Sequence, residues 1–233
     1  MPRPDWHLDE LAHVGPEHLD PAYIATYDRK AGTDSAIDLA LLQGLGLTDT
    51  SVLVDLGAGT GTLTLAAAPH CRQVVAVDVS PAMLAALGAN VAARGLTNVT
   101  VANAGFLSYA HEGPPADFVY SRNALHHLPD FWKGIALTRL AAILRPGGTL
   151  FLRDLVYDFD PSEADATMER WLGGAAASSA DGWTRAELAE HLRDEHSTYT
   201  WLLEPLLERA GFAIREKAVQ GPGTYALYVC VKR

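Results

Sequence analysis

An apolar run that ends in a glycine-rich loop is the feature that most limits how this chain can fold. Residues 51–56 are almost entirely apolar, and Gly57, Gly59 and Gly61 follow them directly. Strands of a parallel sheet have this pattern, because both of their faces are covered and no side chain has to face water. Residues 61–69 are then predicted to form a helix. The segment therefore predicts a strand, a tight loop and a helix within an α/β sheet.

Strands and helices continue to alternate after this first unit. Further strands are predicted at residues 73–78, 98–102, 118–121 and 149–154, and helices at residues 81–95 and 131–144. Ser80 is a suitable N-cap for the helix that begins at Pro81. A helix over residues 200–210 precedes two strands, over 212–219 and 224–231, and the Gly/Pro link between these strands predicts a hairpin. The expected fold is a doubly wound, mostly parallel seven-stranded sheet with an antiparallel C-terminal strand.

Two helical segments lie outside this predicted sheet. Residues 1–47 form one, and residues 159–199 form the other. In the second segment Ser162 is expected to cap one helix, and Thr184 with Glu187 forms a capping-box pattern for the next. We therefore expect a helical N-terminal cap (residues 1–47) and a sheet domain (residues 48–233) that carries a helical insertion at 159–199. Both helical elements are expected to cover the open edge of the sheet as a lid.

Charge and cysteine content exclude several classes of partner. The chain has 28 Asp and Glu against 18 Lys and Arg and no basic cluster, which argues against nucleic acid. Cys71 and Cys230 are too few for a structural zinc site and indicate a reducing cytoplasm. No apolar run approaches the ~20 residues that span a bilayer, so no membrane partner is expected. The sequence is silent on oligomeric state.

Two acidic residues flank the glycine-rich loop. Asp55 opens the loop, and Asp78 ends the next predicted strand. A carboxylate at the second position can accept both hydroxyls of a ribose. The spacing is G-x-G-x-G, with Thr62 where a dinucleotide fingerprint has its third glycine. Because Asp55 would oppose a pyrophosphate, the pattern favours a cationic nucleoside without phosphates, and an NAD(P)-dependent oxidoreductase is the alternative.

Five motifs along the chain resemble the class I S-adenosylmethionine-dependent methyltransferases. They occur in that family's order and span most of residues 48–232, at residues 52–61, 76–84, 116–128, 144–150 and 207–212. The resemblance implies a Rossmann-like fold, S-adenosylmethionine as cofactor, and methyl transfer to an acceptor. It also implies that the loop glycines contact the cofactor's methionine part and ribose, that Asp55 faces its ammonium and that Asp78 holds its ribose. The cofactor-binding residues expected on this basis are Tyr27, Asp55, Gly57, Gly59, Gly61, Asp78, Val79, Gly105, Phe106 and Asn123.

The third predicted strand departs from the family's pattern. Members usually end this strand in an acidic residue that binds the adenine amino group, whereas this chain has Gly105 there. Adenine recognition is then expected to depend on backbone groups, on Asn103 or on stacking by Phe106. Tyr27, in a segment that resembles the family's N-terminal helix, is either a ligand of the cofactor carboxylate or a surface tyrosine.

Several polar residues are candidates for the chemistry on the acceptor side. Methyl transfer is an in-line displacement, to which the protein contributes mainly proximity and orientation. His126 and His127 are candidate general bases, and the alternative is that they pack locally. The predicted acceptor-side residues are Asp154, Tyr157, His196 and Trp201, although Trp201 fits the core as well.

The expected acceptor is a small molecule, and no metal is expected. Catechol-type methyltransferases place an Asp after the fourth strand and an Asp-Asn pair after the fifth, whereas this chain has Asn123 and Asp154-Leu155 there. The Pro-Pro-aromatic tetrad of amide methyltransferases is absent as well. A protein that binds S-adenosylmethionine but catalyses a reaction other than methylation remains a further alternative.

Overall fold

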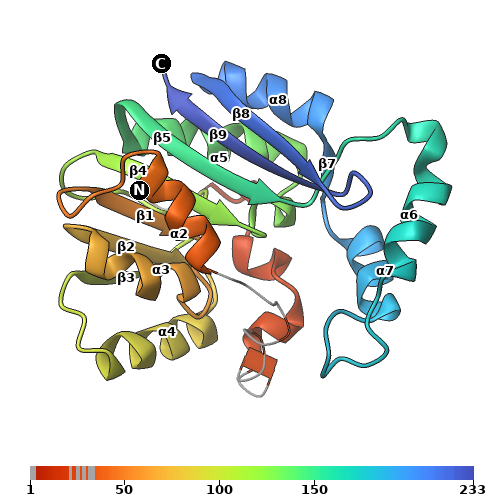
Figure 1. Cartoon of the computed structure of the whole chain (residues 1–233), viewed down its shortest axis with the longest axis horizontal. Coiled ribbons are helices and arrows are strands. Elements are labelled where there is room, and N and C mark those ends of the chain that lie inside the picture. Colours follow the sequence, from red (N-terminus) through yellow and green to blue (C-terminus); the bar gives the residue numbers. More distant parts are fainter. Residues whose placement is uncertain (1–3, 21–22, 25–26, 28–29, 31–34) are drawn as a thin grey trace.

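The chain folds around one central sheet (Figure 1). The computed structural model describes residues 4–20, 23–24, 27, 30 and 35–233. The seven strands lie in the order β3-β2-β1-β4-β5-β9-β8, and β9 runs antiparallel to both of its neighbours. The strands are β1 (Val52–Leu56), β2 (Gln73–Asp78), β3 (Val99–Asn103), β4 (Ala116–Arg122), β5 (Leu144–Asp154), β8 (Phe212–Gln220) and β9 (Tyr225–Lys232). The predicted fold class is therefore confirmed.

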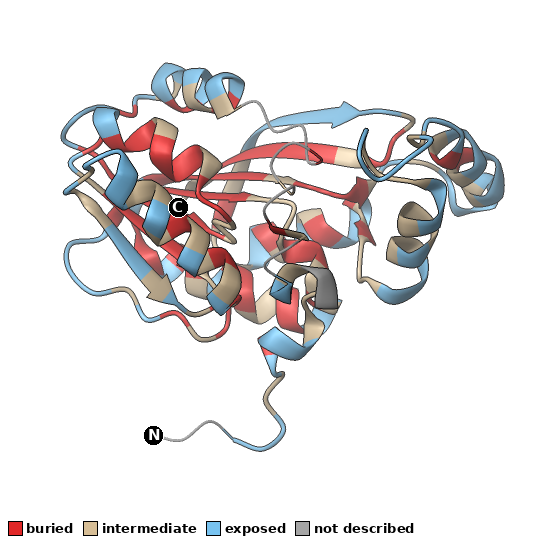
Figure 2. Ribbon diagram, turned by 90° about the horizontal axis from the view of Figure 1, so that it is seen from below, coloured by how far each residue is buried: buried red, intermediate tan, exposed pale blue. Residues whose placement is uncertain are grey.

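Helices cover both faces of the sheet. The covering helices are α2 (Ser35–Gly44), α3 (Thr62–Ala67), α4 (Pro81–Ala93), α5 (Asp130–Ile143) and α8 (Thr200–Arg209), while α6 (Ala164–Gly173) and α7 (Arg185–Asp194) belong to the insertion. Val52 and Val54 of β1 belong to the core that α5 and α8 cover. Leu53, between them, packs with α2 and α3 on the opposite face. This alternation explains why residues 52–54 are all apolar, and Figure 2 shows the buried residues concentrated in the strands.

The N-terminal segment contributes to both the core and the site. Leu42 of α2 and the following Leu47 lie in one apolar cluster with β1 and α3. Upstream, the short turns η1 (Glu10–His13) and η2 (Pro16–Leu19) precede a stretch that is largely outside the described residues. The helix expected around residues 25–29 lies in this stretch, of which only Tyr27 is described. The boundary between a cap and a sheet domain at residue 47 stays a prediction.

The insertion between β5 and α8 is closed at its base by a small second sheet. β6 (Val156–Tyr157) pairs in parallel with β7 (Thr198–Tyr199), a pairing that the sequence did not indicate. Figure 1 shows α6 and α7 beyond the ends of β4 and β5, away from the helices that cover the sheet. The capping box at Thr184 is present, whereas Asp160 and not Ser162 caps the turn before α6. Asp160 accepts a hydrogen bond from the backbone N–H of Ser162, which explains the correction.

Cys71 and Cys230 are buried free thiols. In the part of the chain that the structure describes, no helix combines the length and the apolar character needed to cross a membrane.

Candidate active site

A cavity opens where the carboxyl ends of β1, β2 and β4 meet. Parallel strands end at the same edge of a sheet, so residues far apart in sequence come together there. The N-terminal segment contributes Glu10, His18 and Tyr27 to the walls. Nine of the ten predicted cofactor-binding residues line this first cavity, namely Tyr27, Asp55, Gly57, Gly59, Asp78, Val79, Gly105, Phe106 and Asn123.

Gly61 is the predicted residue that does not line the first cavity. Its φ is +90°, and a Cβ there would lie 2.9 Å from Cγ of Leu87 in α4. Its role is therefore to begin α3 and to pack closely against α4. Gly57, by contrast, has a φ of +78° and lines the cavity, and a Cβ there would overlap the side chain of Ala124. The backbone of the loop can approach a ligand only because these positions carry no side chain.

Asp78 holds the loop in place from the neighbouring strand. Its Oδ2 accepts a hydrogen bond from the Gly59 N–H at 2.8 Å, and its Oδ1 accepts one from the Ser80 N–H at 2.9 Å. Burial raises the pKa of Asp78, although these two N–H groups oppose the rise. Each carboxylate oxygen keeps a second lone pair, so the side chain can still accept hydrogen bonds from a ligand.

Asp55 is the second carboxylate of the first cavity, and it is almost completely buried at the end of β1. Thr64 of α3 donates a hydrogen bond to its Oδ2 at 2.6 Å. Burial nevertheless raises the pKa of Asp55 to about 7. A buried carboxyl group of this kind becomes a carboxylate most readily when a positive charge lies beside it.

Glu10 is a third acidic group in the first cavity, which sequence reasoning missed. It is 6% exposed, and its carboxylate accepts hydrogen bonds from the Leu107 N–H at 2.9 Å and from the Ser108 hydroxyl at 2.8 Å. A Cβ at Gly105 would overlap the Glu10 carboxylate. The glycine that departs from the family's pattern therefore makes room for a carboxylate from the N-terminal segment. Asn103 instead donates to the backbone oxygens of Asp78 and Val79.

A second cavity of about 510 Å³ adjoins the first. Its walls come from the N-terminal segment, from the turn after β4 and from α7 of the insertion. The two cavities share a wall made of Val14, His18, Tyr27, Asn123 and His127. Asn123 has a φ of +50°, which is uncommon for a residue other than glycine and occurs often at functional sites.

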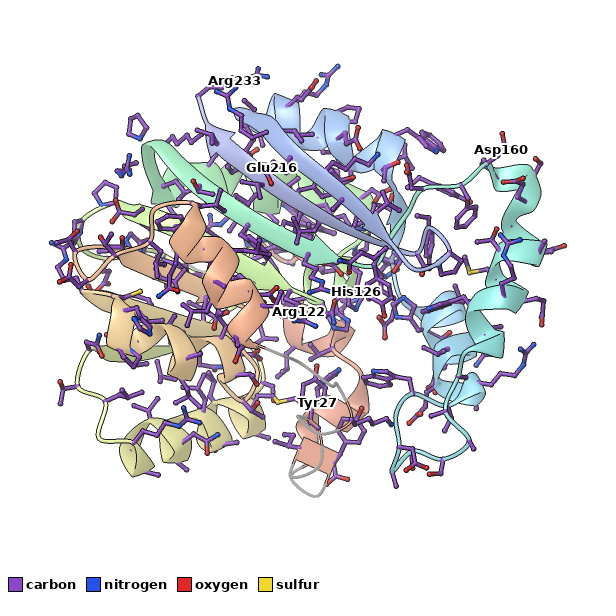
Figure 3. All side chains as sticks on the ribbon, in the orientation of Figure 1. Tyr27, Arg122, His126, Asp160, Glu216 and Arg233 are labelled. Atoms are coloured by element: carbon purple, nitrogen blue, oxygen red, sulfur yellow. The ribbon has the colours of Figure 1, made fainter. Side chains whose placement is uncertain are left out.

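His126 and His127 lie in η4 (Leu125–His127), at the junction of the cavities. In Figure 3 His126 lies where the strands end and α7 approaches. Its Nδ1 lies 2.5 Å from Oδ1 of Asp154, and its Nε2 lies 2.8 Å from Oε2 of Glu195. Burial lowers the pKa of His126, but Asp154 and Glu195 outweigh this effect and raise it to about 9. Both ring nitrogens thus contact carboxylates, and His126 has no free nitrogen for a substrate proton.

His127 has the opposite electrostatic environment. Burial and the neighbouring His126 lower its pKa to about 3, so its imidazole is neutral. Its ring lies between the two cavities.

The four predicted acceptor-side residues are not among the residues that line the two cavities, and their role stays a prediction. Asp154 is buried and accepts hydrogen bonds from the backbone N–H groups of Leu125 and His126. Tyr157 packs against Phe159 and Tyr199. The Lys133 ammonium donates to the backbone oxygen of His196, and Trp201 is 56% exposed, neither in the core nor in a cavity. Trp183, His191, Glu195 and Tyr225 line the second cavity instead.

Comparison with known proteins identifies the family. A family model described as a methyltransferase domain matches residues 53–148. An uncharacterized methyltransferase of Anoxybacillus flavithermus is 27% identical over 164 residues, 70% of each chain. A carboxy-S-adenosyl-L-methionine synthase of Ectopseudomonas mendocina is 30% identical over 162 residues, 66% of this chain and 64% of its own. These matches support a class I S-adenosylmethionine-dependent methyltransferase.

The fold of this methyltransferase also matches a solved structure. Magnesium protoporphyrin IX methyltransferase of Synechocystis PCC 6803, with SAM bound, superposes with a TM-score of 0.65 at 14% identity. The match covers 99% of this chain and 100% of that chain. The methyltransferase domain supports S-adenosylmethionine as the cofactor. The first cavity fits it, since a glycine-rich loop lies there between Asp55 and Asp78.

The pKa of Asp55 predicts how cofactor affinity depends on pH. If the cofactor's positive charge favours the Asp55 carboxylate, affinity rises as this group ionises and levels off above its pKa of about 7. Because apparent affinity scales with the competent fraction, we expect about a tenfold gain between pH 6 and pH 8. Calorimetric titration of the methyltransferase at both pH values measures it. The Asp55→Asn variant serves as the control, and a slope that survives in this variant would contradict the assignment.

Proposed function

We propose that this methyltransferase transfers the methyl group of S-adenosylmethionine to a small-molecule acceptor held in the second cavity. The observation that carries the proposal is the wall that the two cavities share, because an acceptor in the second cavity would lie beside a cofactor in the first. A volume of about 510 Å³ lies in the range of about 300–1,000 Å³ that is typical of small-molecule sites.

The charge of the second cavity indicates the class of acceptor. Its described lining residues include Glu187, Glu190, Asp194 and Glu195, and no Lys or Arg is among them. Lys30 pairs with Glu187 and His126 with Glu195, so among the described residues the negative charge without such a pair comes from Glu190 and Asp194. An anionic acceptor such as a nucleic acid would be repelled by these groups. We therefore favour an acceptor that is neutral or cationic.

The role of the protein in this chemistry is to bind and orient both molecules. The bound cofactor supplies an activated methyl group on its sulfonium. Asp78 and the loop at Gly57 and Gly59 hold the cofactor, while the N-terminal segment and α7 enclose the acceptor and exclude water. The general-base role expected of His126 or His127 stays a prediction, and the contacts on both nitrogens of His126 favour His127. The buried free thiols Cys71 and Cys230 support a cytoplasmic location.

A reaction other than methylation remains the second candidate. The relative from Ectopseudomonas mendocina is named as a carboxy-S-adenosyl-L-methionine synthase and not as a methyltransferase. Incubation with methyl-labelled S-adenosylmethionine and a metabolite extract separates the two candidates. We expect the labelled methyl group to appear in a small molecule other than S-adenosylmethionine. If the cofactor is consumed while no methyl group moves to another molecule, the second candidate is correct.

We further propose that Glu10 accepts a hydrogen bond from the adenine amino group. Its buried carboxylate lies against Gly105 and Val79, where the base is expected. Glu10→Ala should then weaken the binding of S-adenosylhomocysteine about tenfold, the cost of one hydrogen bond to a charged group.

The matched ligand for this test is the deaminated analogue of S-adenosylhomocysteine, which has no amino group to donate. Its affinity should change little in Glu10→Ala, so that the variant no longer distinguishes the two bases. An equal loss for both ligands would show that Glu10 only supports the loop at Leu107 and Ser108.

A further inference from the structure

Three side chains with metal-binding atoms converge at the rim of the second cavity. The ligand atoms of His126, His127 and Glu195 all lie within 4.8 Å of one another. Oε2 of Glu195 lies 2.8 Å from Nε2 of His126 and 3.9 Å from Nδ1 of His127. We propose that these three residues form a binding site for a divalent transition-metal ion.

Two polar atoms of this cluster have no hydrogen-bond partner among the described residues. Oε2 of Glu195 and Nδ1 of His127 are buried atoms that make no hydrogen bond within the described part of the chain. Oε2 also lies 2.5 Å from Nδ1 of His191, but its contacts with His126 and His191 lack hydrogen-bond geometry. Buried polar atoms without partners are rare, because each costs about 1–3 kcal/mol. Atoms that converge without bonding each other are the arrangement that a shared cation would complete.

The surrounding residues hold the proposed ligands in orientation. Asp154 accepts a hydrogen bond from Nδ1 of His126, and this contact turns Nε2 toward Glu195. Asp154 is itself fixed by backbone N–H groups at Leu125 and Leu155. A carboxylate behind a histidine ligand is a recurring feature of metal sites, since it fixes the tautomer and raises the basicity of the ligand.

The ligand set indicates which metal would bind. Two imidazoles and one carboxylate suit Zn²⁺, Fe²⁺, Co²⁺ or Ni²⁺, whereas Mg²⁺ and Ca²⁺ prefer oxygen ligands. Three protein ligands leave at least one position open, as in catalytic metal sites. All three residues line the second cavity, so the open position faces it. That the ion would contact the acceptor rests on the proposed function, whereas metal binding itself does not.

This inference revises the expectation that no metal binds. That expectation considered acidic residues after the fourth and fifth strands, the oxygen-rich pattern of catechol-type enzymes. The two histidines lie in η4, and Glu195 directly follows α7. His127 and Glu195 are 68 positions apart in the sequence. No short motif connects them, and only the fold of the insertion brings them together.

The test is metal binding by the full chain without a histidine tag. Protein stripped with a chelator is titrated with Co²⁺, and visible d–d absorption and elemental analysis report binding. We expect about one ion per chain. Glu195→Gln should weaken Co²⁺ binding about 100-fold. Glu190 lies in α7 and lines the same cavity, and Glu190→Gln should bind Co²⁺ as the wild type does. Asp154→Asn, behind the ligands, should cost about 10–100-fold.

Two outcomes would overturn the inference. One is that stripped wild-type protein gives no d–d band, and the other is that it binds Co²⁺ no tighter than Glu195→Gln does. Because the wild type alone supplies the first outcome, a variant that fails to fold does not leave the question open. S-adenosylhomocysteine binding is measured on the same samples. If that ligand binds while Co²⁺ does not, only the metal site fails and the proposed function stands.

Discussion

Replacing Asp78 by alanine is expected to weaken the binding of S-adenosylmethionine about 100-fold or more. The variant would lose two charge-assisted hydrogen bonds to the ribose, each worth about 1.5–3 kcal/mol, and every 1.4 kcal/mol changes a dissociation constant about tenfold. It would also release the N–H groups of Gly59 and Ser80, which Asp78 now holds. Calorimetric titration with S-adenosylmethionine measures the effect.

The control for this prediction separates ligand binding from loop order. Asp78→Asn keeps the size of the side chain and one oxygen acceptor, so its loss of affinity should be smaller than that of the alanine variant. Thermal unfolding of both variants without cofactor reports how far the loop alone is disturbed. Affinity within twofold of the wild type in Asp78→Ala would remove the ribose assignment.

The largest loss of stability is expected from His126→Ala. This change leaves the Asp154 carboxylate buried without its partner and removes the contact with Glu195. Removal of one partner from a buried ion pair costs about 3–5 kcal/mol. For a chain of this length such a loss lowers the melting temperature by roughly 10 °C. Thermal unfolding of chelator-treated protein measures it.

His127→Ala is the matched variant. His127 lies next to His126 in η4, lines both cavities and makes no hydrogen bond through Nδ1 with the described residues. We expect its melting temperature to stay within a few degrees of the wild type, and its turnover to fall about 100-fold or more with cofactor binding retained. Equal losses of stability in the two variants would show that the pair acts only as a scaffold. Unchanged turnover in His127→Ala would remove this residue from the chemistry.

The parts of the fold that follow from local sequence patterns could be predicted. Residues 52–54 are apolar because helices cover both faces of β1. Gly57 and Asp78 follow from the turn and the strand end that the fold requires. The boundaries of α4 and α7 follow from Ser80 and Thr184, whose side chains cap the backbone within three residues.

The residues that sequence reasoning missed depend on contacts between distant segments. Glu10 reaches Leu107 across 97 positions, and no periodicity or motif connects them. Gly105 did indicate such a contact. A glycine in place of the family's usual acidic residue leaves space, and the Glu10 side chain fills it. Trp201 was misplaced for a related reason: apolar character favours burial, but α8 turns this residue toward solvent while Leu203 enters the core.

A crystal structure with S-adenosylhomocysteine bound would show which groups meet the cofactor and where its sulfur points. We predict the adenine beside Glu10 and Phe106, the ribose hydroxyls on Asp78, and the sulfur facing the wall at His127 that the two cavities share. A sulfur atom turned away from the second cavity, or a ligand bound outside the first, would contradict this prediction.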